Sequence, residues 1–156
     1  MRLKDQVAIV TGGGRGIGRS IALTFANEGA NVAVIARTES EIESVKQEIL
    51  NLGSKAIAIK TDVTDESQVI SMVQRVMDEF GRIDILINNA GFAKHAYIQD
   101  ISNELWDTTI NVNLRGIMLC TRAVYKQMMK QKSGYIINIS SGAGKPKLSY
   151  VEGVTP

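Results

Sequence analysis

The 156-residue sequence has one cysteine, two prolines and no long hydrophobic run. A single cysteine, Cys120, cannot form an internal disulfide, which favours a reducing compartment and therefore predicts a cytoplasmic protein. Because no apolar stretch approaches 18 residues, we expect no membrane span and no signal peptide. The 18 basic and 16 acidic residues leave a formal charge of only +2, so composition gives no indication of a nucleic-acid or membrane surface.

Short apolar segments alternate with stretches of helical periodicity along the whole chain. The apolar segments show no polar alternation, which predicts strands buried on both faces. This order indicates a doubly wound, Rossmann-like α/β fold with a parallel sheet that ends after its fifth strand, in one dinucleotide-binding domain over residues 1–156. The expected strands are Val7–Val10, Val32–Ala36, Ala56–Ile59, Ile83–Ile87 and Tyr135–Ile139, and the expected helices are Arg15–Glu28, 38–52, Asp65–Phe80 and Asn103–Gln131.

Two helices carry local signals that predict their orientation and their start. In the first helix, Ile17, Ile21 and Phe25 follow one another at four-residue spacing, which predicts an apolar face toward the sheet. The second helix opens with Thr38-Glu39-Ser40-Glu41, the spacing of a capping box. We therefore expect the Thr38 and Glu41 side chains to accept hydrogen bonds from free backbone N–H groups at the start of that helix.

A glycine-rich run joins the first strand to the first helix. It reads Thr11-Gly12-Gly13-Gly14-Arg15-Gly16-Ile17-Gly18. Glycine lets the backbone approach a ligand closely, and a helix N-terminus offers free N–H groups and partial positive charge. A glycine-rich turn needed only for tight packing is the structural alternative, but the strand-loop-helix context favours a site for the pyrophosphate of a dinucleotide.

Several ordered motifs resemble those of the short-chain dehydrogenase/reductase family. The glycine run has the family spacing Thr-Gly-x-x-x-Gly-x-Gly. The spacing Thr-Gly-x-x-Gly-x-x-Gly of sugar-nucleotide epimerases of the extended branch fits less well, because with Gly14 as its middle glycine the last one would fall on Ile17. Further matches follow in order at Asp62-Val63, Asn88-Asn89-Ala90-Gly91, Asn111-Val112-Asn113-Leu114 and Asn138-Ile139-Ser140-Ser141. The resemblance implies cofactor contacts from Gly12, Gly14, Arg15, Gly16, Ile17, Gly18, Asp62, Val63, Asn89, Ala90 and Gly91.

Two of these segments have a structural alternative beside their implied role. The resemblance assigns Asp62 to the adenine amino group. A helix cap is the alternative for that carboxylate, although Thr64 and Asp65 are better placed for capping. For Asn88 and Asn89 the family pattern implies that the segment both stabilises the sheet and lines the site of the cofactor ribose. The two roles are compatible.

The end of the second predicted strand bears on the choice between NADP and NAD. NAD-preferring sites place an acidic residue there, about 20 residues beyond the glycine motif, to accept from the ribose 2′-OH. Here the position is Ala36, and Arg37 follows it. A guanidinium without a carboxylate favours a 2′-phosphate, with Arg15 as a second charge, so we expect NADP and regard NAD as the less favoured cofactor. The alternative is that Arg37 is a solvated surface residue.

The catalytic residues of the family are matched only in part. The resemblance implies hydride transfer to or from a small carbonyl or alcohol substrate, with Ser141 holding the substrate oxygen and Asn113 holding a relay water. A tyrosine and a lysine four residues later complete the family pattern, but no Tyr-x-x-x-Lys motif occurs here. Tyr150 has Val154 where the lysine would stand, which favours an ordinary loop tyrosine.

Two explanations of this gap remain open from the sequence. In the favoured one, the chain is part of an oxidoreductase whose C-terminal portion is absent. In the other, it is a non-catalytic NADP(H)-binding module or remnant. The family pattern also implies a homodimer or homotetramer through the long helix, where Trp106, Tyr125, Met128 and Met129 offer apolar surface, although core packing is an equal alternative for each.

Overall fold

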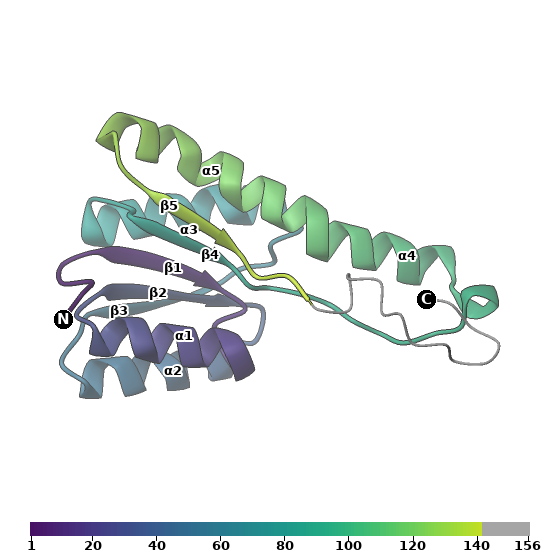
Figure 1. The fold of residues 1–156 in the computed structure, drawn as a ribbon, viewed down its shortest axis with the longest axis horizontal. Helices are drawn as coiled ribbons and strands as arrows, with labels where there is room; N and C mark the ends of the chain where they lie inside the picture. The colour runs from purple at the N-terminus through teal and green to yellow at the C-terminus, as the bar shows by residue number, and fades with distance from the viewer. Residues whose placement is uncertain (142–156) are drawn as a thin grey trace.

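The computed structural model describes residues 1–141, which form one parallel sheet with helices on both faces (Figure 1). The strands are β1 (Val7–Thr11), β2 (Asn31–Ala36), β3 (Ala56–Lys60), β4 (Ile85–Asn88) and β5 (Tyr135–Asn138). The helices are α1 (Gly16–Asn27), α2 (Glu39–Asn51), α3 (Glu66–Phe80), α4 (Asn103–Ile110) and α5 (Gly116–Gln131), with a short 3-10 turn at Ile98–Asp100.

The strands lie in the order β3-β2-β1-β4-β5, and all four neighbouring pairs are parallel. The chain therefore builds outward from β1 to one edge, returns, and builds to the other edge from β4. This order confirms the predicted doubly wound α/β fold. It also places a topological switch point between β1 and β4, and ligands of such folds bind there, outside the carboxyl ends of the strands.

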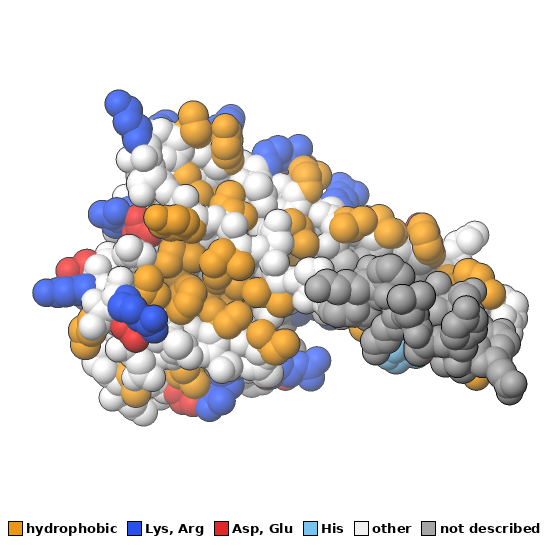
Figure 2. All heavy atoms as spheres, in the orientation of Figure 1, with side chains coloured by type: hydrophobic (Ala, Val, Ile, Leu, Met, Phe, Trp, Pro, Cys, Tyr) orange, Lys and Arg blue, Asp and Glu red, His pale blue; other side chains and the backbone are white. Residues whose placement is uncertain are grey.

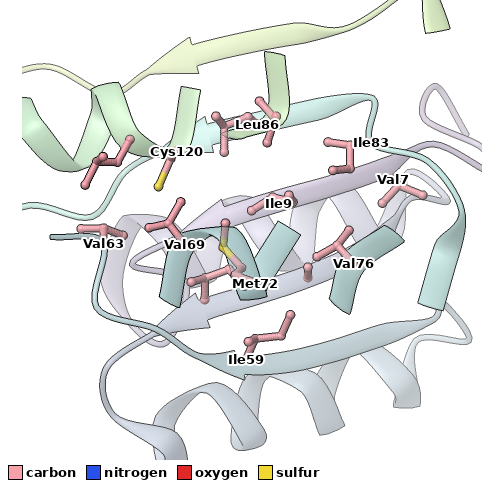
Figure 3. Close-up of a cluster of buried hydrophobic side chains, with 14 of the residues drawn as sticks. Val7, Ile9, Ile59, Val63, Val69, Met72, Val76, Ile83, Leu86 and Cys120 are labelled. Carbon is pink, nitrogen blue, oxygen red and sulfur yellow. The ribbon is translucent and has the colours of Figure 1, made fainter. Parts of the chain in front are cut away.

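Two separate apolar layers hold the helices to the sheet. On one face α3 and α5 pack through residues such as Met72 and Leu119 against Ile9 and Leu86 (Figure 3). On the other face α1 and α2 cover Ala8, Val10, Val32 and Val34. Because side chains of a strand alternate between faces, both layers draw on β1 and β2, and these strands are buried almost completely.

The strand β5 corrects one expectation from the sequence. It was predicted to be buried on both faces, yet Tyr135 is 66% exposed and Ile137 is 45% exposed. Only Ile136 packs on the α3 and α5 side, while α1 and α2 cover the other strands on the opposite face. Figure 2 shows hydrophobic side chains gathered over β4 and β5 on the viewed face. An edge strand with one bare face explains the difference.

Helix α1 meets the core through the predicted residues Ile21 and Phe25, which are partly buried, but not through the predicted Ile17. Its buried residues are Gly18, Ala22 and Ala26, whereas Ile17 is 64% exposed. The reason is steric, because a Cβ on Gly18 would lie only 2.2 Å from the carbonyl oxygen of Gly12. Small residues let α1 approach the glycine loop closely, and Ile17 is left at the surface beside that loop.

The long helix predicted over Asn103–Gln131 contains an irregular turn. Residues Asn111–Arg115 form a π-helical turn between α4 and α5. Such turns occur often at functional sites because they shift side chains and free backbone groups. Within residues 1–141, no helix is long and apolar enough to cross a membrane.

Candidate cofactor-binding site

A cavity of about 360 Å³ opens at the carboxyl ends of β1, β2, β3 and β4. Its volume is within the range of small-molecule sites, and its place beside β1 and β4 is the switch point of the sheet. All twelve residues predicted to contact a cofactor line it. They are Gly12, Gly14, Arg15, Gly16, Ile17, Gly18, Arg37, Asp62, Val63, Asn89, Ala90 and Gly91.

The glycine loop brings the uncapped start of α1 to this cavity. Arg15 occupies the N-cap position without a side-chain hydrogen bond to the helix, and the first turn holds no acidic residue. The backbone N–H groups of this turn therefore keep their capacity to bind an anion. Gly16 has a φ of 54°, a left-handed conformation that favours glycine and sets the direction in which α1 leaves the loop.

One threonine hydroxyl ties the glycine loop to the loop after β4. Thr11 Oγ1 donates to the Ile87 carbonyl at 3.1 Å and accepts from the backbone N–H groups of Asn89 and Ala90, both at 3.0 Å. The Asn89 amide in turn donates to the carbonyl oxygens of Thr11 at 3.0 Å and Gly12 at 3.2 Å. Asn89 thus holds two walls of the cavity together, which leaves its amide nitrogen committed to the protein.

Asp62 and Asp65 divide two tasks that the sequence left open. Asp65 is the N-cap of α3 and accepts from the N–H groups of Ser67 and Gln68. The Ser67 and Gln68 hydrogen bonds lower the pKa of Asp65. Asp62 accepts from Thr64 through Oδ1 only and lines the cavity, so it is not the helix cap.

The wall of the cavity at the end of β2 carries positive charge. Ala36 ends the strand, and Arg37 forms no ion pair or hydrogen bond with any residue in the described part of the chain. Arg15 approaches from the glycine loop and faces Glu41, with 3.9 Å between Nη1 and Oε1. Both guanidinium groups are exposed, so an anion entering this end of the cavity can reach them.

The lining fits the adenosine and diphosphate parts of a dinucleotide. The open N–H groups at the start of α1 suit a diphosphate. Gly12 packs closely against the loop after β4, since a Cβ at that position would lie 2.9 Å from Ala90 Cα. Asp62 offers an acceptor, and the two arginines offer donors for phosphate. Among the described residues, no cluster of histidine, cysteine or acidic side chains is placed to hold a metal.

Asn113 and Ser141, predicted from the resemblance to act in catalysis, are not among the described residues that line this cavity. Asn113 lies in the π-helical turn and forms a paired contact with Phe92, in which Oδ1 accepts from the backbone N–H and Nδ2 donates to the carbonyl, both at 2.8 Å. It therefore ties the helix to the loop beyond Gly91. Ser141 is exposed, three residues after β5, and Tyr150 and Val154 lie outside the described residues.

A second polar contact joins the ends of β4 and β5. The buried Asn88 donates through Nδ2 to Asn138 Oδ1 at 2.9 Å and to Thr121 Oγ1 at 3.2 Å. This contact fixes β5, and with it the chain leading to Ser141, against the centre of the sheet. Nearby Cys120 is fully buried, and burial raises the pKa of its thiol to about 12, which keeps it protonated and unreactive.

The comparisons with known proteins agree with this geometry. The family model for short chain dehydrogenase matches residues 6–152. The chain belongs to this family. Among curated short-chain dehydrogenases, a 3-oxoacyl-(acyl-carrier-protein) reductase from Synechocystis is 43% identical over 143 residues. The match covers 91% of this chain but 58% of the relative, so the chain spans little more than half the length of that protein.

Solved structures of short-chain dehydrogenases superpose closely on the described fold. A metagenomic short-chain oxidoreductase in complex with NADP gives a TM-score of 0.89 at 36% identity, covering 96% of this chain and 68% of its own. An NAD⁺-bound xylitol dehydrogenase gives 0.90 at 33% identity, covering 99% and 58%. The fold of this chain thus occurs in a protein solved with NADP and in one solved with NAD⁺.

Five residues of the cavity were not among the cofactor contacts predicted from the sequence. Glu41 is the most informative, because the capping-box spacing assigned it to the backbone of α2. In the structure Thr38 makes no side-chain cap, and Glu41 turns to Arg15 instead. Spacing alone does not reveal which way a first-turn carboxylate points. The five residues are Ala36, Thr38, Glu41, Thr61 and Val112.

Proposed function

We propose that residues 1–156 form the cofactor-binding part of an NADP-dependent oxidoreductase that acts on a small carbonyl or alcohol substrate. The observation that carries the proposal is the cavity itself, which is lined by the uncapped N-terminus of α1 and by Arg37, a residue without an ion pair within residues 1–141. When bound, the nicotinamide would exchange a hydride with the substrate carbon. Membership of the short-chain dehydrogenase family supports this reaction class.

The lining residues have distinct parts in cofactor binding. The N–H groups at the start of α1 hold the diphosphate, and Asp62 accepts from the adenine amino group. Arg37 binds the 2′-phosphate that distinguishes NADP from NAD, since β2 ends in Ala36 and offers no carboxylate to a ribose 2′-OH. The NADP complex of the metagenomic relative supports this choice. Because a xylitol dehydrogenase of similar fold is solved with NAD⁺ bound, NAD stays the second, less favoured option.

Ser141 and Asn113 serve the substrate side in this proposal. The Ser141 hydroxyl donates to the substrate oxygen, where a hydrogen bond strengthens as negative charge develops. Asn113 holds the relay water, because its Oδ1 has a second lone pair beside the one bound to Phe92. The curated relative is named for a 3-oxoacyl substrate, which supports a carbonyl compound as the substrate class.

A non-catalytic NADP(H)-binding module is the second candidate, and the absent Tyr-x-x-x-Lys motif favours it. Because the family's proton donor belongs to this motif, we expect the 156-residue polypeptide to bind NADPH but not to oxidise it. The intact mass of the natural protein separates the two candidates. A mass near 17.0 kDa favours the module, while a larger protein that oxidises NADPH with a carbonyl compound favours the enzyme.

The cofactor assignment is tested by titrating NADP⁺ and NAD⁺ into the chain and into its Arg37→Asp variant. Reversing this charge should weaken NADP⁺ binding at least tenfold and change NAD⁺ binding little, because only NADP⁺ carries the 2′-phosphate. Arg75→Asp on α3 is the matched control, since Arg75 is exposed and does not line the cavity. Equal loss for both cofactors would contradict the role of Arg37.

A further inference from the structure

We propose that Glu41 is a specificity-determining residue that opposes the 2′-phosphate of NADP by competing for Arg15. The inference rests on the proposed cofactor site and assigns a role to a residue within it. Glu41 lines the cavity together with Arg15 and Arg37. Its carboxylate therefore lies in the same cavity as the two positive charges that a phosphate would approach, 3.9 Å from the Arg15 guanidinium.

The position of Glu41 is built into the fold. The neighbouring Ile42 is 1% exposed in the core, which fixes the rotation of the first turn of α2. On the other side Gly14 lies directly against Glu41, since a Cβ on Gly14 would lie 2.9 Å from Glu41 Cβ and 3.1 Å from Oε2. The side chain is only about one-third exposed, at 35%. The carboxylate is thus held over the glycine loop.

In the part of the chain that the structure describes, no other contact competes for the Glu41 carboxylate. The Glu41 side chain makes no hydrogen bond within residues 1–141, and its one ion pair there is the 3.9 Å contact with Arg15. By contrast, Glu43 on the same helix accepts two hydrogen bonds from Lys46. Because the Arg15 contact is long and partly exposed, it is weak enough for a phosphate to displace.

The two arginines therefore differ in what they offer to an incoming phosphate. Arg37 has no partner among the described residues and is fully available, whereas Arg15 is already partly neutralised by Glu41. A 2′-phosphate must draw Arg15 away from this carboxylate and also meets its negative charge. The 2′-OH of NAD neither breaks the Arg15–Glu41 contact nor is repelled by the Glu41 charge. Glu41 therefore lowers the preference for NADP over NAD without acting on the rest of the dinucleotide.

The test is to measure the dissociation constants of NADP⁺ and NAD⁺ by calorimetry for the unmodified chain and for Glu41→Gln. Glutamine keeps the shape and removes the charge. We expect NADP⁺ to bind about five- to tenfold more tightly at low salt and NAD⁺ to change less than about twofold. The gain should shrink at about 0.5 M salt, where charges beyond a few ångströms are screened.

Glu43→Gln is the matched control, because it removes the same charge from the same helix outside the cavity. Arg15→Gln adds a second readout. It should weaken NADP⁺ binding more in the Glu41→Gln background than alone, since Arg15 is then fully available to phosphate.

Three results overturn the inference. In the first, Glu41→Gln binds NADP⁺ as tightly as the unmodified chain does, while Arg37→Asp still weakens binding. Glu41 then has no role in specificity, and the cofactor assignment stands. Weaker NAD⁺ binding in Glu41→Gln with NADP⁺ unchanged would make Glu41 a direct acceptor from the ribose. If neither the unmodified chain nor Glu41→Gln binds NADP⁺, the proposed function fails as well.

Discussion

Strands β1 and β5 belong to the same parallel sheet but have opposite surroundings. Every residue of β1 is buried between the two helical layers, whereas Tyr135, Ile137 and Asn138 of β5 are exposed. The glycine loop extends from the buried strand, and Ser141 follows the exposed one. The cofactor cavity thus stands on a packed core, while the segment proposed to meet the substrate stands on a strand with one bare face.

The largest expected difference between the two strands is in stability. Ile9→Ala in β1 should lower the free energy of unfolding by about 3 kcal/mol, because it leaves a cavity in a fully packed layer. Ile137→Ala in β5 removes the same atoms from a side chain that is 45% exposed and should cost less than about 1 kcal/mol. Urea unfolding measures both, and equal losses would contradict the comparison.

The next effect concerns the hydroxyl that joins the glycine loop to the end of β4. Thr11→Val removes a hydroxyl that donates to one backbone carbonyl and accepts from two backbone N–H groups. We therefore expect the free energy of unfolding to fall by about 2 kcal/mol and NADP⁺ to bind more weakly. Thr11→Ser restores the hydroxyl and should recover most of both. If the Thr11→Val variant binds NADP⁺ as tightly as the unmodified chain does, the hydrogen bonds of the Thr11 hydroxyl are not needed to shape the cavity.

The exposed apolar residues give a third prediction, on self-association. Trp106, Tyr125 and Met129 are each more than half exposed on the helices, while Met128 is buried in the core. If a homo-oligomer forms through these helices, Tyr125→Lys should shift the mass in sedimentation toward 17.0 kDa. Ile137→Lys is the comparison on β5. A shift caused by Ile137→Lys alone would move the contact to the bare strand.

The smallest effect is on the acid stability of α3. The pKa of Asp65 lies below its ordinary value of 3.8, because Ser67 and Gln68 donate hydrogen bonds to the carboxylate. Because the pKa of Asp65 is lower in the folded than in the unfolded protein, the ionised carboxylate stabilises the fold. This contribution is complete at pH values above the pKa of the unfolded chain and is lost as the pH falls through the pKa of the folded protein. The urea midpoint should therefore fall from neutral pH to about pH 3, and Asp65→Asn should flatten that dependence.

The sequence predicted the fold well because its signals are local and agree with one another. The β1 run, the glycines that follow α1, α2 and α3, and the Asp65 cap each identify an element boundary in the structure. Exposure was predicted less well. Burial of β5 depends on which helices cover its two faces, and this cannot be derived from the three apolar residues of that strand.

The site was predicted as a set of residues but not as a set of contacts. Twelve of the lining residues were predicted, eleven from the family resemblance and Arg37 from its place after the second strand, and the parallel strands bring them together at their carboxyl ends. Which partner each side chain chooses depends on packing between distant segments. Asn89 is bonded to the glycine loop, Asn113 to Phe92, and Glu41 faces Arg15 and not the start of its own helix.

The central claim is that the cavity at the end of β1 binds NADP, with Arg37 at the 2′-phosphate. Amide resonances of the isotope-labelled chain, followed by NMR during NADP⁺ and NAD⁺ titrations, test it most directly. Both cofactors should shift the amides of Gly12–Gly18 and Asp62, and NADP⁺ should shift Arg37 more strongly than NAD⁺ does. Shifts confined to the α3 and α5 surface, with the glycine loop unchanged, would contradict the claim.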